Sequence, residues 1–66
     1  MKVHMKDWFV LNKKLDLREY HCQHLYSFGE VIGETEKAYK LSVMAMLGTI
    51  EKAVTIWAPK SVCFVK

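Results

Sequence analysis

The sequence predicts an α+β fold in which an N-terminal helix packs on a three- or four-stranded antiparallel β-sheet meander. Two observations lead to this prediction. Residues 39–57 alternate apolar and polar side chains around Gly48-Thr49, which is the pattern of a β-hairpin. Residues 8–15 instead repeat apolar side chains at intervals of three and four, the period of a helix. A length of 66 residues, 52% of them hydrophobic and 26% charged, suits a single domain, 1–66.

The N-terminal third is predicted to form a helix from about residue 7 to residue 21. Asp7 suits its first turn, because a negative charge there lies at the positive end of the helix dipole. The apolar side chains of this region are expected on one stripe that faces the sheet and is interrupted by Arg18: Trp8, Leu11, Leu15, Cys22 and Leu25. Asn12 and Asp16 favour a helix less, and a break near Leu15-Asp16 is compatible with the pattern.

Three strands follow in the predicted meander. Residues 25–32 are rich in aromatic and β-branched side chains, and residues 33–36 read as a turn. The next two strands form a hairpin closed by a type II′ turn at Gly48-Thr49. That closure sets a register that pairs like with like: Leu47 with Ile50, Val43 with Val54, Leu41 with Ile56 and Ser42 with Thr55. Pro59 ends the last strand, and residues 62–65 are expected to add a short edge strand.

Residues 35–58 also fit a helix, which leaves an all-α helical hairpin as the alternative fold. Its turn would lie near Gly29–Gly33, and its apolar positions recur at helical spacing: Tyr39, Val43, Met46, Ile50, Ala53 and Trp57. A glycine at position 48 would cost that helix about 1 kcal/mol relative to alanine. The run of β-branched residues would weaken it further. The strand interpretation is therefore favoured.

Charge and size bear on function. The net charge is +3, and Arg18 is the only arginine among ten basic residues. Lysine suits phosphate contacts without base readout, so a low-specificity nucleic-acid-binding protein is one reading. Its phosphate contacts would be Lys2, Lys6, Lys13, Lys14, Lys40 and Lys60, with Trp57 or Trp8 stacking on bases. A chain this short has little room for a substrate pocket, so we do not expect an enzyme.

The cysteines and histidines form no recognisable site. His21-Cys22-Gln23-His24 lacks the paired spacings of zinc ligands, and two cysteines are too few for a disulfide framework. A zinc-stabilised adaptor that uses Cys22, His24 and Cys63 remains a minor alternative, and otherwise we expect no metal, cofactor or catalytic residue. No apolar run reaches the length of a signal peptide or a membrane span, so we expect a cytoplasmic protein without membrane contact.

One surface stands out as a candidate contact face. Most aromatic side chains are expected to pack inward in so small a core. The hairpin register, however, places Trp57 on the polar face beside Lys40, with Met44 and Met46 on the same side and Lys60 just past Pro59. An exposed Trp next to adaptable Met side chains is typical of a partner surface. The predicted partner-binding residues are Trp57, Lys60, Lys40, Met44 and Met46.

Two segments carry a resemblance to a known group of proteins: Glu34-Thr35-Glu36-Lys37-Ala38-Tyr39 and Trp57-Ala58-Pro59-Lys60-Ser61. The pair resembles a signature, E-T-E-K-A followed by W-x-P-K-S, of small uncharacterised proteins from phages, prophages and other mobile elements. The resemblance spans residues 30–63 and implies a compact antiparallel sheet. Members of this group often continue with Gln after the second segment, where this chain has Val62. The group has no assigned activity, so the resemblance implies no catalytic residue.

These observations together predict a non-catalytic protein-binding accessory protein of a phage or mobile element. Its expected partner is a host or phage protein complex, which it would block by steric occlusion. Inhibition of a host defence system such as CRISPR is one candidate role. The low-specificity nucleic-acid binder is the alternative, and a homodimer remains open because a small core with Met and Trp on a second face favours association.

Overall fold

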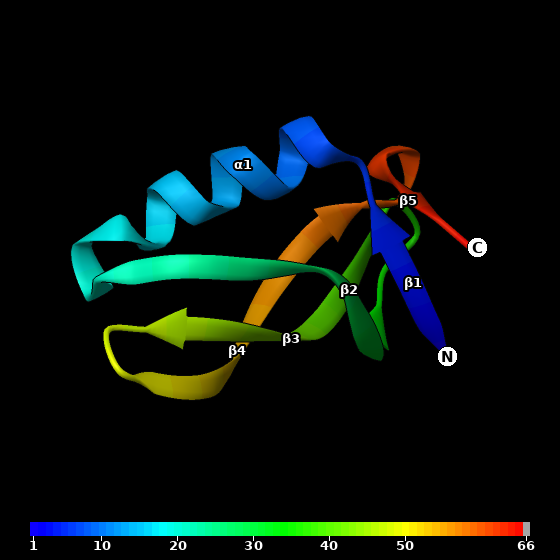
Figure 1. Cartoon of the computed structure of the whole chain (residues 1–66). Helices are drawn as coiled ribbons and strands as arrows, with labels where there is room; N and C mark the ends of the chain where they lie inside the picture. The colour runs from blue at the N-terminus through cyan, green and yellow to red at the C-terminus, as the bar shows by residue number, and fades with distance from the viewer. Residues whose placement is uncertain (66) are drawn as a thin grey trace.

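The fold is α+β, with one helical segment packed on a five-stranded antiparallel sheet (Figure 1). The computed structural model describes residues 1–65. Its elements in chain order are β1 (Lys2–Met5), α1 (Asp7–Asp16), the 3₁₀ turn η1 (Leu17–Tyr20), β2 (Cys22–Glu34), β3 (Ala38–Leu47), β4 (Ile50–Pro59), the 3₁₀ turn η2 (Lys60–Val62) and β5 (Cys63–Phe64). The strand order is β4-β3-β2-β1-β5. The α+β prediction is confirmed, and the all-α alternative is wrong.

The β3–β4 hairpin has the predicted register throughout. Leu47 pairs with Ile50, and every pair from there to Ala38 and Pro59 follows in step. Gly48 has φ +65°, and Thr49 is not among the residues with positive φ, which agrees with a type II′ turn. Strand β4 ends at Pro59, as predicted. The apolar alternation determined this register because a slip of one residue would turn every core side chain toward solvent.

Strand β2 joins this hairpin as the predicted meander, but it is longer than predicted and irregular. It pairs with β3 with register shifts between Cys22 and His24, between Leu25 and Gly29, and between Val31 and Gly33. Such shifts are β-bulges, which bend a strand and increase its twist. Gly29 allows β2 and β3 to approach closely, since an added Cβ would lie 2.7 Å from Val43 Cγ2 and 2.9 Å from the Ser42 carbonyl oxygen.

The prediction of three or four strands missed β1. This strand pairs with β2 on one side and with β5 on the other, so both ends of the described chain lie at one edge of the sheet (Figure 1). Val3 and Met5 are each only 1% exposed, and Lys2 and His4 alternate with them. Four residues are too few for this alternation to stand out in a sequence. The expected edge strand near residues 62–65 exists as β5, but it pairs with β1 rather than with the meander.

The helical segment runs from Asp7 to Tyr20, close to the predicted range, but it is rotated relative to the prediction. Phe9 is the buried residue of α1, whereas Trp8, Leu11 and Leu15 are exposed. The predicted stripe also included Cys22 and Leu25, which lie in β2. The helical segment ends at His21, which adopts the left-handed conformation with φ 63°.

A short connection explains this rotation. Only Lys6 separates β1 from α1, and hydrogen bonds hold it in place. Its N–H donates to the Val62 carbonyl at 2.9 Å, and its own carbonyl accepts from the N–H groups of Phe9 and Val10 at 3.0 and 3.1 Å. The direction of the chain as it leaves β1 therefore decides which side of α1 meets the sheet.

The core fills the space between α1 and the sheet. Its buried members come from strands β1 to β4 and from α1 and η2: Val3, Met5, Phe9, Cys22, Leu25, Leu41, Val43, Ala45, Ile56, Ala58 and Val62. Lys13 and Lys14 lie in the last turn of α1, where positive charge is favourable next to the negative end of the helix dipole. Within residues 1–65, no helix is long and apolar enough to cross a membrane.

Candidate binding face

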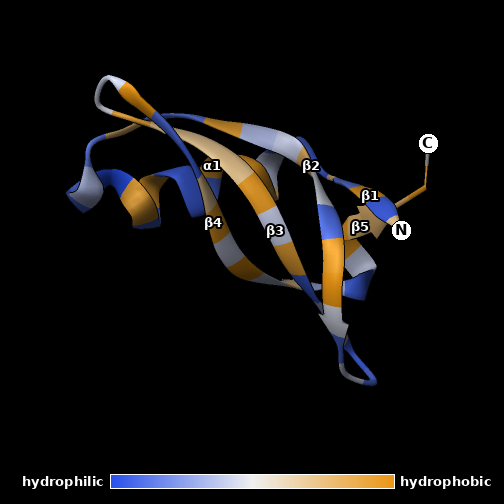
Figure 2. Cartoon of the chain, turned by 90° about the horizontal axis from the view of Figure 1, so that it is seen from below, coloured by the Kyte–Doolittle hydropathy of each residue, from blue (hydrophilic) through white to orange (hydrophobic). Residues whose placement is uncertain are grey.

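The side of the sheet opposite α1 is uncovered. Along β3, the buried residues Leu41, Val43 and Ala45 face the helix, so the residues between them face the other way. Figure 2 shows this side, with the sheet in front of α1. We call it the open face. Its aromatic and Met side chains are His4, His24, Tyr26, Phe28, Met44, Met46, Trp57 and Phe64, and its charged side chains are Lys2, Glu30, Lys40 and Glu51. The strand registers place all of them except Tyr26, which is placed by its ring contacts with His24 and Phe28.

Five aromatic rings form a continuous row across the open face. The ring centroids are 5.1 Å apart for His24–Tyr26, 5.6 Å for Tyr26–Phe28, and 5.7 Å for both Phe28–His4 and His4–Phe64. The row therefore crosses from β2 through β1 to β5. Most of these rings meet at tilted or edge-on angles, the arrangement that aromatic pairs prefer. The row therefore forms a continuous aromatic surface.

An open hollow adjoins this row where the bulge of β2 displaces its backbone. It has a volume of about 570 Å³ and is lined by Gln23, His24, Leu25, Tyr26, Ser27, Phe28 and Met46. Leu25 and Gly29 of β2 pair with Ala45 and Val43 of β3. Three residues of β2 lie between the first two, whereas only Met44 lies between the second two, so the extra residues of β2 have no pairing partners. The hollow is therefore a consequence of the strand geometry. It is widely open to solvent.

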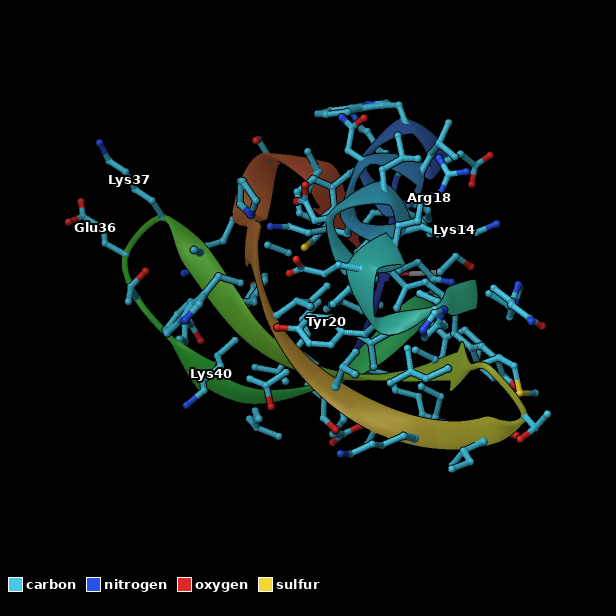
Figure 3. All side chains as sticks on the ribbon, turned by 90° about the vertical axis from the view of Figure 1, so that its left-hand side faces the viewer. Lys14, Arg18, Tyr20, Glu36, Lys37 and Lys40 are labelled. Carbon is cyan, nitrogen blue, oxygen red and sulfur yellow. The ribbon has the colours of Figure 1, made fainter. Side chains whose placement is uncertain are left out.

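Four of the five predicted contact residues lie on the open face. Trp57 pairs with Lys40 across β3 and β4, and Met44 and Met46 lie on the same side. Trp57 is 48% exposed, and Figure 3 shows Lys40 pointing away from the helix. Met46 also lines the hollow at the bulge of β2. The structure thus brings these four residues to one surface.

Lys60 is engaged elsewhere. Its ammonium group forms an ion pair with Glu34 and lies 5.1 Å from the centroid of the Tyr39 ring. Tyr39 pairs with the buried Ala58, so it lies on the helix side of the sheet. Lys60 therefore does not join the open face, contrary to the prediction. Its partners explain this, because an ion pair and a cation–π contact hold the side chain over the other side.

Lys60 also joins the segments 34–39 and 57–61. Its backbone N–H donates to the Lys37 carbonyl at 2.8 Å, and the Glu34–Lys60 ion pair links the same segments through their side chains. Within the first segment, the Thr35 N–H donates to the Ala38 carbonyl at 2.8 Å. These bonds hold the β2–β3 turn against the end of β4. The two segments thus form one structural unit at this end of the sheet.

The sequence reasoning missed the aromatic row itself. Most aromatic side chains are expected to pack inward, but Phe9 is the buried aromatic residue of the described chain, and Tyr26, Phe28 and Phe64 lie on the open face. The sequence of β2 could have indicated this placement, because Tyr26 and Phe28 alternate in step with the polar residues His24 and Glu30, and alternate residues of a strand lie on the same face. His4 and Phe64 carried no such signal, since they reach the row only through the pairing of β1 with β2 and β5.

Most of the basic side chains lie away from the open face. Lys6, Lys13 and Lys14 belong to α1 or to the residue before it, and Lys60 is held by Glu34. On the open face, Lys2 lies 5.6 Å from the centroid of Phe28, and Lys40 pairs with Trp57. Two carboxylates lie there as well. The Tyr26 hydroxyl donates to Glu51 at 3.5 Å, and Glu30 is 2.9 Å from the N-terminal amine.

That amine changes the ionisation of Glu30. Its hydrogen bond and its positive charge both hold the pKa of Glu30 below the ordinary value of a glutamate. Glu30 is therefore a carboxylate at neutral pH, and its charge is balanced locally. The open face as a whole carries mixed and sparse charge around an apolar centre.

The proposed zinc ligands do not converge. Cys22 is buried at the start of β2, and its thiol donates to the His24 carbonyl at 3.6 Å. Cys63 lies in β5 and pairs with Met5. Among residues 1–65, no group of three or more His, Cys, Asp or Glu side chains is arranged to hold a metal ion. Partial burial raises the pKa of the Cys63 thiol, which makes it a poor nucleophile at neutral pH.

Comparison with known proteins adds no functional assignment, since no family model, no curated protein and no solved structure matches this chain.

Proposed function

We propose that the chain is a non-catalytic protein-binding protein that engages its partner through the open face. The observation that carries this proposal is the continuous row of rings, next to Met44 and Met46, on a sheet face that α1 leaves uncovered. The centres of protein interfaces are rich in aromatic and Met side chains and poor in charge, with polar groups around them. The open face has this composition.

The distribution of charge favours a protein partner over a nucleic acid. Binding of single strands needs stacking rings and a basic track on the same surface. Here the rings lie on one side of the sheet, whereas Lys6, Lys13 and Lys14 lie on the helix side. The open face offers mainly Lys2 and Lys40, and Glu51 and Glu30 oppose them. Phosphate contacts on the helix side would therefore leave the aromatic row unused.

The biological role we propose follows from the resemblance to small proteins of phages and mobile elements. The partner is a host or phage protein complex, and the chain acts by covering a surface of that complex. Inhibition of a host defence system such as CRISPR is one form of this role. The hollow at the bulge of β2 would receive an apolar side chain of the partner, and the flexible thioether of Met46 would adapt to it.

A variant-controlled capture experiment tests this proposal. Tagged protein is used to recover partners from bacterial lysate with and without nuclease, and bound proteins are identified by mass spectrometry. Met46→Lys places a charge in the hollow, and the matched control Ile50→Lys places the same charge at an exposed position on the helix side of the hairpin. Far-UV circular dichroism confirms that each variant is folded.

The expected result is a defined protein complex that resists nuclease, is lost with Met46→Lys and is retained with Ile50→Lys. Trp57→Ala is expected to weaken capture as well, since Trp57 lies on the same face and is half exposed. Equal capture by both lysine variants would contradict the proposal. Recovery that disappears with nuclease and falls steeply with salt would favour the nucleic-acid alternative instead.

A further inference from the structure

The outer side of α1 presents an apolar stripe to solvent. Trp8, Leu11 and Leu15 are 58%, 57% and 52% exposed, and their spacing of three and four residues places them on one side of the helix. Phe9 marks the opposite side, which packs on the core. Figure 1 shows α1 lying over the sheet with its far side free of the other elements drawn. A helix normally turns its apolar stripe inward, so this stripe needs another partner.

Unpaired charges border the stripe. Asp7, Lys14 and Arg18 are seven and four residues apart, which places them along the same flank of the helical segment. Lys14 and Arg18 line a hollow of about 380 Å³ together with Leu11 and Leu15, so they adjoin the stripe directly. Figure 3 shows Lys14 and Arg18 on the same side of the helix. None of the three charges takes part in an ion pair within residues 1–65.

We propose that a second copy of this chain covers the stripe, with the two α1 helices antiparallel across a twofold axis. In the register that sets Trp8 against Leu15 of the second copy, the two Leu11 side chains meet close to the axis. Asp7 then lies level with Asp16 of the second copy and two residues from both Lys14 and Arg18 there. Asp16 is on the other flank of the helix, where it pairs with Lys13, whereas Lys14 and Arg18 are on the flank that Asp7 faces. The twofold axis makes this attraction occur twice. The charges that border the stripe are thus complementary to those of a second copy, and the apolar side chains meet across the axis.

The border charges also argue against the other occupants. An anionic lipid surface is bound by helices whose polar border is basic, whereas Asp7 lies on this border and Asp16 and Glu19 lie nearby. The stripe is short, and a standard interface buries about 800 Å² on each partner. We therefore expect a weak dimer with a dissociation constant on the order of tens of micromolar, the class of small interfaces. The inference is independent of the proposed function, which uses the opposite side of the sheet.

Sedimentation velocity of the full chain over a concentration series, from about ten-fold below to ten-fold above this constant, tests the inference. The wild-type protein is expected to shift from monomer to dimer. Leu11→Lys brings two like charges together at the axis and is expected to raise the dissociation constant at least about ten-fold. Trp57→Ala is the matched control, because it removes a comparably exposed Trp from the open face and is expected to leave the equilibrium unchanged.

Charge exchange tests the antiparallel register. Asp7→Lys alone is expected to weaken the dimer, and the combination of Asp7→Lys, Lys14→Glu and Arg18→Glu is expected to restore it. All these positions are on the surface of the helical segment, and circular dichroism checks that the variants fold. A monomer at every concentration would overturn the inference, as would a dimer that survives Leu11→Lys. Failure of the triple variant to restore association would overturn the register. Vesicle binding by a monomer, lost with Leu11→Lys, would assign the stripe to lipid instead.

Discussion

Replacing Gly29 with alanine is expected to lower the free energy of unfolding by about 2–3 kcal/mol, the upper range for overpacking. The new Cβ would lie 2.7 Å from Val43 Cγ2, about 1 Å inside an ordinary carbon–carbon contact. Val43 is a core side chain that is only 1% exposed, so a shift would press it against other close-packed core side chains. The Cβ would also lie 2.9 Å from the Ser42 carbonyl oxygen, which belongs to the backbone of β3. The strands therefore have to separate.

This loss is large relative to the stability of so small a domain. Sixty-six residues correspond to a total of roughly 3–10 kcal/mol. Loss of 2–3 kcal/mol corresponds to a fall in Tm of about 10–20 °C. Urea unfolding followed by far-UV circular dichroism measures the change, and a denaturant slope near 1 kcal/mol/M implies a midpoint lower by about 2–3 M.

Two further variants separate crowding from the other effects of losing a glycine. Gly48→Ala has no atom within 4 Å of its new Cβ but keeps a positive φ of 65°, so it is expected to cost about 1–2 kcal/mol from backbone strain alone. Val43→Ala removes the methyl group that the new Cβ meets. The double variant Gly29→Ala, Val43→Ala is therefore expected to be more stable than the sum of the single changes predicts, by about 1 kcal/mol. A stability of Gly29→Ala within about 0.5 kcal/mol of wild type, or strict additivity, would refute the close approach of β2 and β3.

Three other predictions follow from the same structure. Leu41→Ala is expected to lower the free energy of unfolding by about 2–5 kcal/mol because Leu41 is fully buried. Leu11→Ala at low protein concentration should change it by less than about 0.5 kcal/mol, because Leu11 is exposed. Equal losses of stability in urea unfolding would contradict the orientation of α1. The fold lowers the pKa of Glu30, so the stability that Glu30 contributes is present above the ordinary pKa of 4.5 and is lost as the pH falls through the folded-state pKa. In Glu30→Gln, the unfolding midpoint is therefore expected to depend less steeply on pH below pH 5. An unchanged pH profile would exclude the ion pair with the N-terminal amine. Cys63 is partly exposed and Cys22 is buried, so iodoacetamide is expected to label Cys63 first. Its labelling at neutral pH should be slower than that of a free thiol, because burial raises the pKa of Cys63. Mass spectrometry gives the order, and earlier labelling of Cys22 would show that the start of β2 opens.

The sequence predicted the β3–β4 hairpin down to individual residue pairs. A two-residue turn leaves no freedom in how the two strands align, and the alternation of ten residues on each side repeats the same register signal many times. The position of Trp57 beside Lys40 on the polar face followed from that register alone, whereas its exposure depends on the absence of a covering element over the described sheet. Local signals of this kind need no knowledge of the rest of the fold.

The aromatic row could not be predicted in the same way. His4 and Phe64 are sixty residues apart in the chain, and they meet because β1 pairs with both β2 and β5. The placement of Lys60 is similar, since only the folded chain brings it to Glu34 and Tyr39. A candidate site assembled from five strands depends on the pairings of β1 with β2 and β5, which neither composition nor spacing specifies.

The sequence by itself determined the class of fold, the approximate extent of the helical segment, the hairpin and its register, because each depends on the periodicity of neighbouring residues. The tertiary structure alone decided the fifth strand, the open face as an aromatic surface and the rotation of α1. The physical reason for that rotation is the single-residue connection at Lys6. Its hydrogen bonds to Val62, Phe9 and Val10 set the phase of the helix, so Phe9 turns into the core and the larger stripe of Trp8, Leu11 and Leu15 faces solvent.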